Sequence, residues 1–221
     1  MTSKLYWKCA DFDYKVWCMT WQEFTALLVL ATTMSFTPGP NTTLSTALAA
    51  NGGLRRAMPF VCAVPLGWSG LLLLCALGLG ALLLAVPILA LVVKMVGVAY
   101  LVWMAFKLSQ ARQLLEADAA KLQVGFWQGV ALQFVNIKAW MLALAIVSGW
   151  IAGRGDTAQR LAVVIPVMLF FAFSSNLLYA TLGSLLRDWL RGPIGTGRRL
   201  LAFNRVMALI LLVTALWMLT V

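Results

Sequence analysis

The stretch MSFTPGPNTTLS, residues 34–45, sets two prolines, a glycine and a cluster of polar side chains inside an apolar run. Pro38 and Pro40 have no amide hydrogen, so two carbonyl groups one turn earlier lose their helical partners. Gly39 lets the backbone leave helical geometry at little steric cost. Non-helical backbone at membrane depth survives where it is buried in protein or lines a wet cavity. The pattern predicts a helix that is broken inside the membrane.

The two ends of such a break suit a zwitterion. The amides of Asn41 and Thr42 begin the next half-helix, whose partial positive charge can hold a carboxylate. The carbonyl groups before the break suit a cation. The alternative is a kink that only shapes packing, with polar side chains bonded to a neighbouring helix. We expect these residues to bind substrate or break the helix: Thr37, Gly39, Asn41 and Thr42 for binding, Pro38 and Pro40 for the break.

A second polar group lies in the run QFVNIKAW, where Asn136 and Lys138 interrupt apolar sequence. A lysine inside a membrane is costly unless paired, so it indicates a functional site. Lys138 could face a substrate carboxylate, or its long stem could reach a polar surface. Gln133, one turn earlier, could face the same side as Asn136. These three residues complete the predicted substrate-binding set, while residues 174–176 either line the same cavity or bond between helices.

Membrane-spanning helices must position these residues. The chain has 221 residues, of which 62% are hydrophobic and 11% charged. A soluble domain is about half apolar and about a quarter charged. The apolar runs exceed the roughly 18 to 20 residues that cross a bilayer. The fold class is therefore an all-α integral membrane protein, with the lipid bilayer as its surroundings.

Six transmembrane helices are expected, as two inverted three-helix repeats with the first helix broken at PGPN. The spans cover residues 21–50, 59–83, 87–108, 126–151, 161–186 and 201–221. Because each half holds an odd number of spans, the second half enters the membrane upside down. The expected division is a polar N-terminal extension at 1–20, a first repeat at 21–110, a charged connection at 111–125 and a second repeat at 126–221.

The first 20 residues lack the apolar core of a signal peptide. Met19 starts a more natural opening, so the extension is interpreted as a possible start-site artefact. Lys and Arg gather in the first, third and fifth connections, which the positive-inside rule places in the cytoplasm, with both termini outside. The lysines of the extension argue for the opposite orientation.

Several function classes are disfavoured. The net charge of +10 comes from scattered Lys and Arg without a dense basic block, so nucleic-acid binding is not expected. The four cysteines form no CxxC pair and the chain has no histidine, so neither a metal nor a cofactor is expected. No Asp or Glu lies deep inside a predicted span, since Glu23 is at the mouth of the first, and this argues against an enzyme. Proton coupling would then use Lys138, the substrate's own ionisation or backbone groups, or the protein is a facilitator.

Five blocks in this order resemble the LysE/RhtB amino-acid exporters. They are FTPGPNTTLS, GLRRAMPFVCAVPLGWSG, ALGLGALLLAVPIL, VVKMVGVAYLVWMAFKL and FWQGVALQFVNIKAW, and the resemblance covers residues 19–221. It implies a multi-pass protein of the bacterial inner membrane. It also implies export of amino acids or related small polar metabolites by alternating access.

The family's two motifs map onto both polar groups. Its first-helix motif corresponds to residues 38–41, and its fourth-helix motif, usually Asn-Pro-Lys, corresponds to residues 136–138. Ile137 stands where proline is usual. Without that proline the fourth helix need not break as the first does. The resemblance therefore does not decide between a symmetric and an asymmetric site.

An ion channel or a non-transporting membrane subunit is the alternative function. A channel predicts open conductance, whereas an exporter predicts saturable flux and counter-transport. The sequence does not rank amino-acid-like substrates, although the shortage of carboxylates disfavours a dicationic one. A homo-oligomer is left open.

Overall fold

A computed structural model describes residues 19–111, 124–192 and 197–220. Most of the N-terminal extension and of the charged connection therefore lies outside the described residues. The described chain is helical. Its helices are α1 (Trp21–Phe36), α2 (Pro40–Gly52), α3 (Leu54–Ala76), α4 (Leu79–Ala85), α5 (Pro87–Gln110), α7 (Phe126–Val135), α8 (Ile137–Ile146), the π-helix η1 (Val147–Ile151), α9 (Thr157–Arg191) and α10 (Arg198–Thr220).

Four of these helices, α3, α5, α9 and α10, are long and apolar enough to cross a membrane. The count over the described residues rises to five if α7 and α8 with η1 form one span bent by 69°. The expectation of an all-α membrane protein is confirmed at this level. The first predicted span consists of two helices, α1 with 16 residues and α2 with 13, and each is shorter than the about 20 residues a span needs.

The second predicted span, 59–83, differs from the structure at both ends. It begins earlier, at Leu54, and ends earlier, at Ala76. Gly78 has a φ of 105°, in the left-handed region that favours glycine, so the helix ends there and the short α4 follows. The apolar run alone could not reveal this corner, because the sequence stays apolar from the end of α3 through α4.

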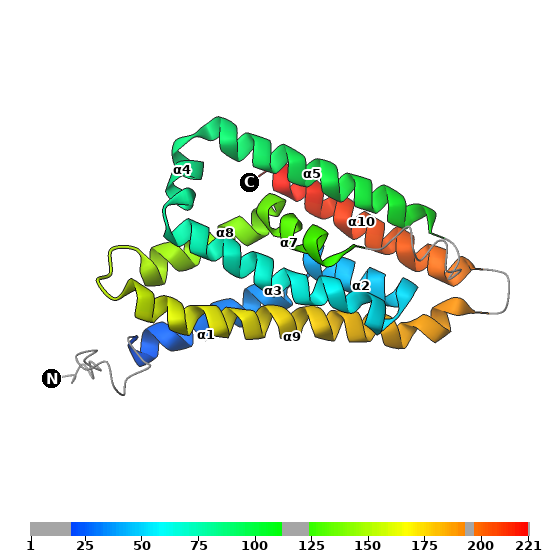
Figure 1. Ribbon diagram of the computed structural model, residues 1–221. Coiled ribbons are helices and arrows are strands. Elements are labelled where there is room, and N and C mark those ends of the chain that lie inside the picture. The colour runs from blue at the N-terminus through cyan, green and yellow to red at the C-terminus, as the bar shows by residue number, and fades with distance from the viewer. Residues whose placement is uncertain (1–18, 112–123, 193–196, 221) are drawn as a thin grey trace.

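Small residues let the central helices approach closely. A Cβ added at Gly183 of α9 would collide with the backbone of Thr46 in α2. A Cβ at Gly67 of α3 would lie 2.8 Å from the carbonyl oxygen of Val130 in α7. Small residues at helix contacts are typical of membrane bundles. α5 and α10 pack beside each other on the other side of the bundle from α9 (Figure 1).

The buried apolar side chains form two large clusters, one toward each end of the bundle. Helix α1 belongs to one cluster through Leu27, whereas α2 belongs to the other through Leu44. The same division separates α8, with Ile146, from α7, with Leu132. The two interruptions, between α1 and α2 and between α7 and α8, therefore lie where the apolar clusters meet, near the middle of the bundle.

Candidate functional site

The first interruption leaves carbonyl groups of α1 without helical donors. Pro38 has no N–H to offer the carbonyl of Met34. The N–H of Gly39 donates to Thr42 Oγ1 at 3.0 Å instead of to the carbonyl of Ser35. The C-terminal end of α1 consequently keeps its partial negative charge.

Donors from the second half of the chain approach this carbonyl end. Lys138 Nζ donates to the carbonyl oxygen of Thr37 at 2.9 Å, and Tyr179 OH donates to that of Phe36 at 3.0 Å. A cation at a helix C-terminus is electrostatically favoured. Gly39 leaves room for the lysine, because a Cβ there would lie 3.3 Å from both Cδ and Nζ of Lys138. The predicted lysine thus lies at the predicted helix break.

The second interruption falls at Asn136, and it forms without proline. Asn136 Oδ1 accepts from the N–H of Lys138 at 3.2 Å and caps α8. The indole Nε1 of Trp140 donates to the carbonyl of Phe134 at 2.8 Å, which replaces a lost helical bond. Although Ile137 stands where proline is usual, α7 and α8 still meet at 69°. Here an amide cap and an indole take up the backbone groups that leave the helical pattern, whereas at the first break proline removes the helical donor.

The two interruptions are linked by a pair of amides. Asn41 Nδ2 donates to Gln133 Oε1 at 2.8 Å, and Gln133 Nε2 donates back to Asn41 Oδ1 at 3.2 Å. Gln133 is fully buried and also donates to the carbonyl of Gly129 at 3.0 Å. The pair of Asn41 and Gln133 therefore joins α2 to α7. Gln133 does not line the cavity described next.

A cavity of about 60 Å³ lies between the two breaks. Six of the seven predicted substrate-binding residues line it: Thr37, Gly39, Asn41, Thr42, Asn136 and Lys138. Lys138 is the one ionisable side chain among the described lining residues. Within the described ranges, no group of His, Cys, Asp or Glu could hold a metal ion.

Sequence reasoning missed the apolar wall of this cavity. Trp68 of α3, Leu142 of α8 and Met168 of α9 contribute to it. Apolar residues at these positions give no signal in a chain that is apolar throughout. Ser175 and Asn176, whose role was open, also line it, and Asn176 Oδ1 accepts from Ser45 Oγ at 2.9 Å. Asn176 therefore both lines the cavity and bonds between helices.

Comparison with known proteins places the chain in a family. The family described as LysE type translocator matches residues 32–220, a region that contains both breaks and the cavity. The chain belongs to the LysE type translocator family. This confirms the resemblance to the LysE/RhtB exporters, and it agrees with a multi-pass protein of the bacterial inner membrane.

Named relatives of this LysE-type translocator carry out efflux. The cysteine/O-acetylserine efflux protein of Salmonella choleraesuis (strain SC-B67) is 29% identical over 82% of this chain and 89% of its own length. The protein of that name in Escherichia coli (strain K12) is 28% identical over the same shares. No solved structure matches the chain.

Proposed function

We propose that this LysE-type translocator exports small amino acids or related polar metabolites, and that the cavity between the two breaks is its substrate site. The observation that carries the proposal is the meeting of Lys138 with the broken ends of α1 and α2 in one cavity. An intramembrane lysine beside exposed helix ends is suited to binding a charged solute. The proposal assigns no enzymatic activity to the chain.

The substrate carboxylate would bind at the start of α2. The amides of Asn41 and Thr42 belong to the first turn of α2, where no preceding helical carbonyl accepts their hydrogens. Both residues line the cavity. Lys138 uses one of its three N–H donors on Thr37, which leaves others for the same carboxylate. Helix amides and an ammonium group together form a strong anion site.

The substrate ammonium would bind at the end of α1. Met34 and Ser35 line the cavity, and their carbonyl groups are the ones that lost helical donors at the break. A zwitterion bound this way would have its two charges at helix ends of opposite sign. Asn136 would contribute a polar amide on the facing wall.

The rest of the lining selects the side chain of the substrate. Trp68, Leu142 and Met168 provide an apolar wall, and the described lining holds no carboxylate. A second positive charge would be desolvated without a counter-charge and would lie near Lys138. We therefore assign the site to zwitterions with small uncharged side chains. Cysteine and O-acetylserine, which appear in the names of the relatives, are of this kind.

The expected six-span architecture fits this site. In it α1 and α2 together form the first span, and α7 with α8 and η1 forms the fourth, so each three-span repeat opens with a broken helix. The repeats would cover residues 21–110 and 126–221, joined by the connection at 111–125 and preceded by the extension at 1–20. Broken helices at the interface of inverted repeats are the usual substrate site of secondary transporters. At each break, the helix before it packs in one apolar cluster and the helix after it packs in the other. This shared pattern supports the arrangement.

The size of the cavity favours alternating access over a channel. Small-molecule sites usually measure roughly 300–1,000 Å³, whereas this cavity measures about 60 Å³ and has room for only a few waters. A substrate would therefore enter only after the helices move. A channel, the alternative function, would need a continuous open path.

The test is uptake into inside-out vesicles or efflux from cells preloaded with labelled cysteine, O-acetylserine, lysine and glutamate. The proposal expects saturable export of the first two and counter-transport when unlabelled substrate is added. Lack of export of every solute would contradict it. Current that does not saturate with substrate in a planar bilayer would favour the channel instead.

A further inference from the structure

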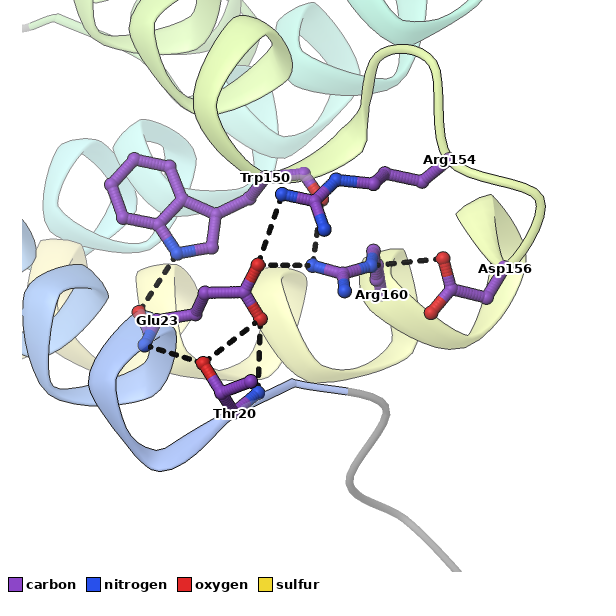
Figure 2. A network of polar contacts seen from close by, with 6 residues as sticks. All are labelled: Thr20, Glu23, Trp150, Arg154, Asp156 and Arg160. Carbon is purple, nitrogen blue, oxygen red and sulfur yellow. Dashed lines mark hydrogen bonds and ion pairs between the residues drawn. The ribbon is translucent and has the colours of Figure 1, made fainter. Parts of the chain in front are cut away.

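A cluster of charged groups joins the two halves of the chain far from the cavity, at the N-terminal end of α1. Figure 2 shows this mouth cluster, which consists of Thr20, Glu23, Trp150, Arg154, Asp156 and Arg160. Glu23 Oε1 lies 3.0 Å from Arg154 Nη2 and 3.5 Å from Arg160 Nη1. The indole Nε1 of Trp150 donates to the backbone carbonyl of Glu23 at 2.8 Å.

Arg160 is also held in place by residues of the second half of the chain. Arg160 Nε pairs with Asp156 at 2.9 Å, and its Nη1 donates to the carbonyl of Trp150 at 3.2 Å. The Arg160 side chain is only 6% exposed, whereas that of Arg154 is 42% exposed. Two carboxylates and two guanidinium groups balance in charge, so the partly buried cluster carries no uncompensated charge.

Helix α1 has few buried side chains to hold it against the bundle. Only Leu27 and Ala31 of α1 are buried, whereas 11 residues of α2 are buried. The other end of α1 is held by the donors to Phe36 and Thr37 described above. Between α1 and α2 the backbone is non-helical, which allows α1 to move while α2 stays packed.

We propose that the mouth cluster is a gate: it closes one end of the transport path, and it opens when α1 swings about the break between Phe36 and Pro40. This proposal rests on the proposed export function. Opening at this end leaves Arg160 paired with Asp156, and water can reach Arg154, whose side chain is 42% exposed. Glu23 is the positioning residue of the gate, since it alone in the cluster's ion pairs comes from the first half of the chain.

The opposite end of the bundle is closed by different chemistry. Asn51 of α2 and Asn204 of α10 exchange two hydrogen bonds, of 2.8 and 3.0 Å, and both residues are at most 3% exposed. Asn204 also donates to the carbonyl of Ala111 at 3.0 Å. Separating these buried amides would leave several polar groups unpaired in an apolar region. The two ends are therefore held by different contacts, an arrangement compatible with their opening in turn during alternating access.

The distribution of charge places the gate on the outer face. In Figure 1 the start of α1 and the turn before α9 lie at one end of the bundle, and the end of α9 and the start of α10 lie at the other. Arg55, Arg56, Arg198 and Arg199 belong to connections at that other end, which the positive-inside rule assigns to the cytoplasm. Arg154 and Arg160 lie at the gate end, but the two of them are outnumbered by the four arginines at the other end. The mouth cluster is then the exit gate for exported substrate.

Thiol labelling tests the gate without any transported substrate. In a chain whose four native cysteines are replaced by serine, Ser35→Cys puts a thiol on the cavity wall. A membrane-impermeant maleimide is added outside intact cells, with and without Glu23→Gln. We expect labelling to be about fivefold faster with Glu23→Gln, because the partly exposed ion pairs no longer hold α1. Asp188→Asn, the same chemical change near the other end of α9, is the control and should leave the rate unchanged. Equal rates for Glu23→Gln and its parent would overturn the proposal.

Cross-linking then tests whether the gate must open during transport. In the chain without native cysteines and without Ser35→Cys, the pair Glu23→Cys with Arg154→Cys is joined by a cleavable bis-maleimide. Efflux of labelled O-acetylserine is then measured. We expect efflux to stop and to return after cleavage. The control pair, Ala158→Cys with Ala162→Cys, lies outside the mouth cluster on consecutive turns of α9, where both residues are exposed, and should not block efflux when joined. Undiminished efflux from the cross-linked Glu23→Cys protein would overturn the gate. Absence of efflux before cross-linking would count against the export function, and the labelling rates would still decide on the gate.

Discussion

Lys138 Nζ lies 2.9 Å from the carbonyl oxygen of Thr37, a contact between residues 101 positions apart. It joins the start of α8, at the second interruption, to the end of α1, at the first. The lysine enters from the start of α8, where its charge is disfavoured, and reaches the end of α1, where it is favoured. The contact therefore both stabilises the meeting of the two halves and leaves a charged group in the cavity.

Gly39→Ala tests the fit of the lysine to the break. Gly39 has a φ of −168°, which any residue adopts, so alanine brings no backbone strain. Its Cβ would lie 3.3 Å from Lys138 Nζ and displace the ammonium group from Thr37. We expect the KM for efflux to rise about tenfold at matched membrane levels, in line with a lost charge-assisted hydrogen bond. Gly149→Ala, which meets nothing within 4 Å, is the control and should leave the KM unchanged. An unchanged KM in Gly39→Ala would contradict the placement of the lysine.

Asn41 and Gln133 form a pair whose members should act as one unit. Replacing either by alanine leaves the other amide, buried in Gln133 and half-buried in Asn41, without its partner, which costs about 1–3 kcal/mol of stability. We expect the double substitution to cost little more than either single one, because the loss is shared. Thermal unfolding of the detergent-purified variants measures this. Fully additive losses would mean that the two amides do not depend on each other.

Ile137→Pro tests why the chain breaks between α7 and α8. Asn136 already has φ −91° and ψ 102°, a conformation suited to the residue before proline, and Ile137 is the first residue of α8, where proline is favoured. We expect Ile137→Pro to retain folding and transport within about twofold.

Ala143→Pro, in the interior of α8, is the contrasting substitution and should cost about 3 kcal/mol or more. The readouts are the amount of folded protein in the membrane and the initial rate of efflux. Equal damage by both prolines would show that Asn136 does not provide a ready-made helix start.

The first break was predictable from the sequence because proline and glycine act through their own covalent structure. The second was not, because its cause is a side-chain contact: the Trp140 indole reaches a carbonyl six residues earlier. Gln133 was expected to face the substrate, but its amide found a partner 92 positions away. Sequence spacing reports which residues share a helix face, whereas such long-range partners depend on how the helices pack.

The mouth cluster could not be predicted from the sequence for the same reason. Glu23 was recognised as the acidic residue at the mouth of the first span, but nothing in the sequence connects it with Arg154 and Arg160. The apolar wall around Trp68 also escaped prediction, since composition cannot separate a cavity wall from a lipid-facing surface in a chain of this kind.

The most direct test of the substrate site compares two lysines that both reach backbone carbonyls. Lys138 does so inside the cavity, whereas Lys94 of α5 donates to the carbonyl of Leu219 at 3.4 Å, away from it. The measurement is the initial rate of O-acetylserine efflux from proteoliposomes that contain equal amounts of wild type, Lys138→Gln or Lys94→Gln. The account predicts a loss of about tenfold or more for Lys138→Gln, as for a lost charged partner, and little change for Lys94→Gln. Undiminished efflux by Lys138→Gln, or equal losses in both variants, would contradict it.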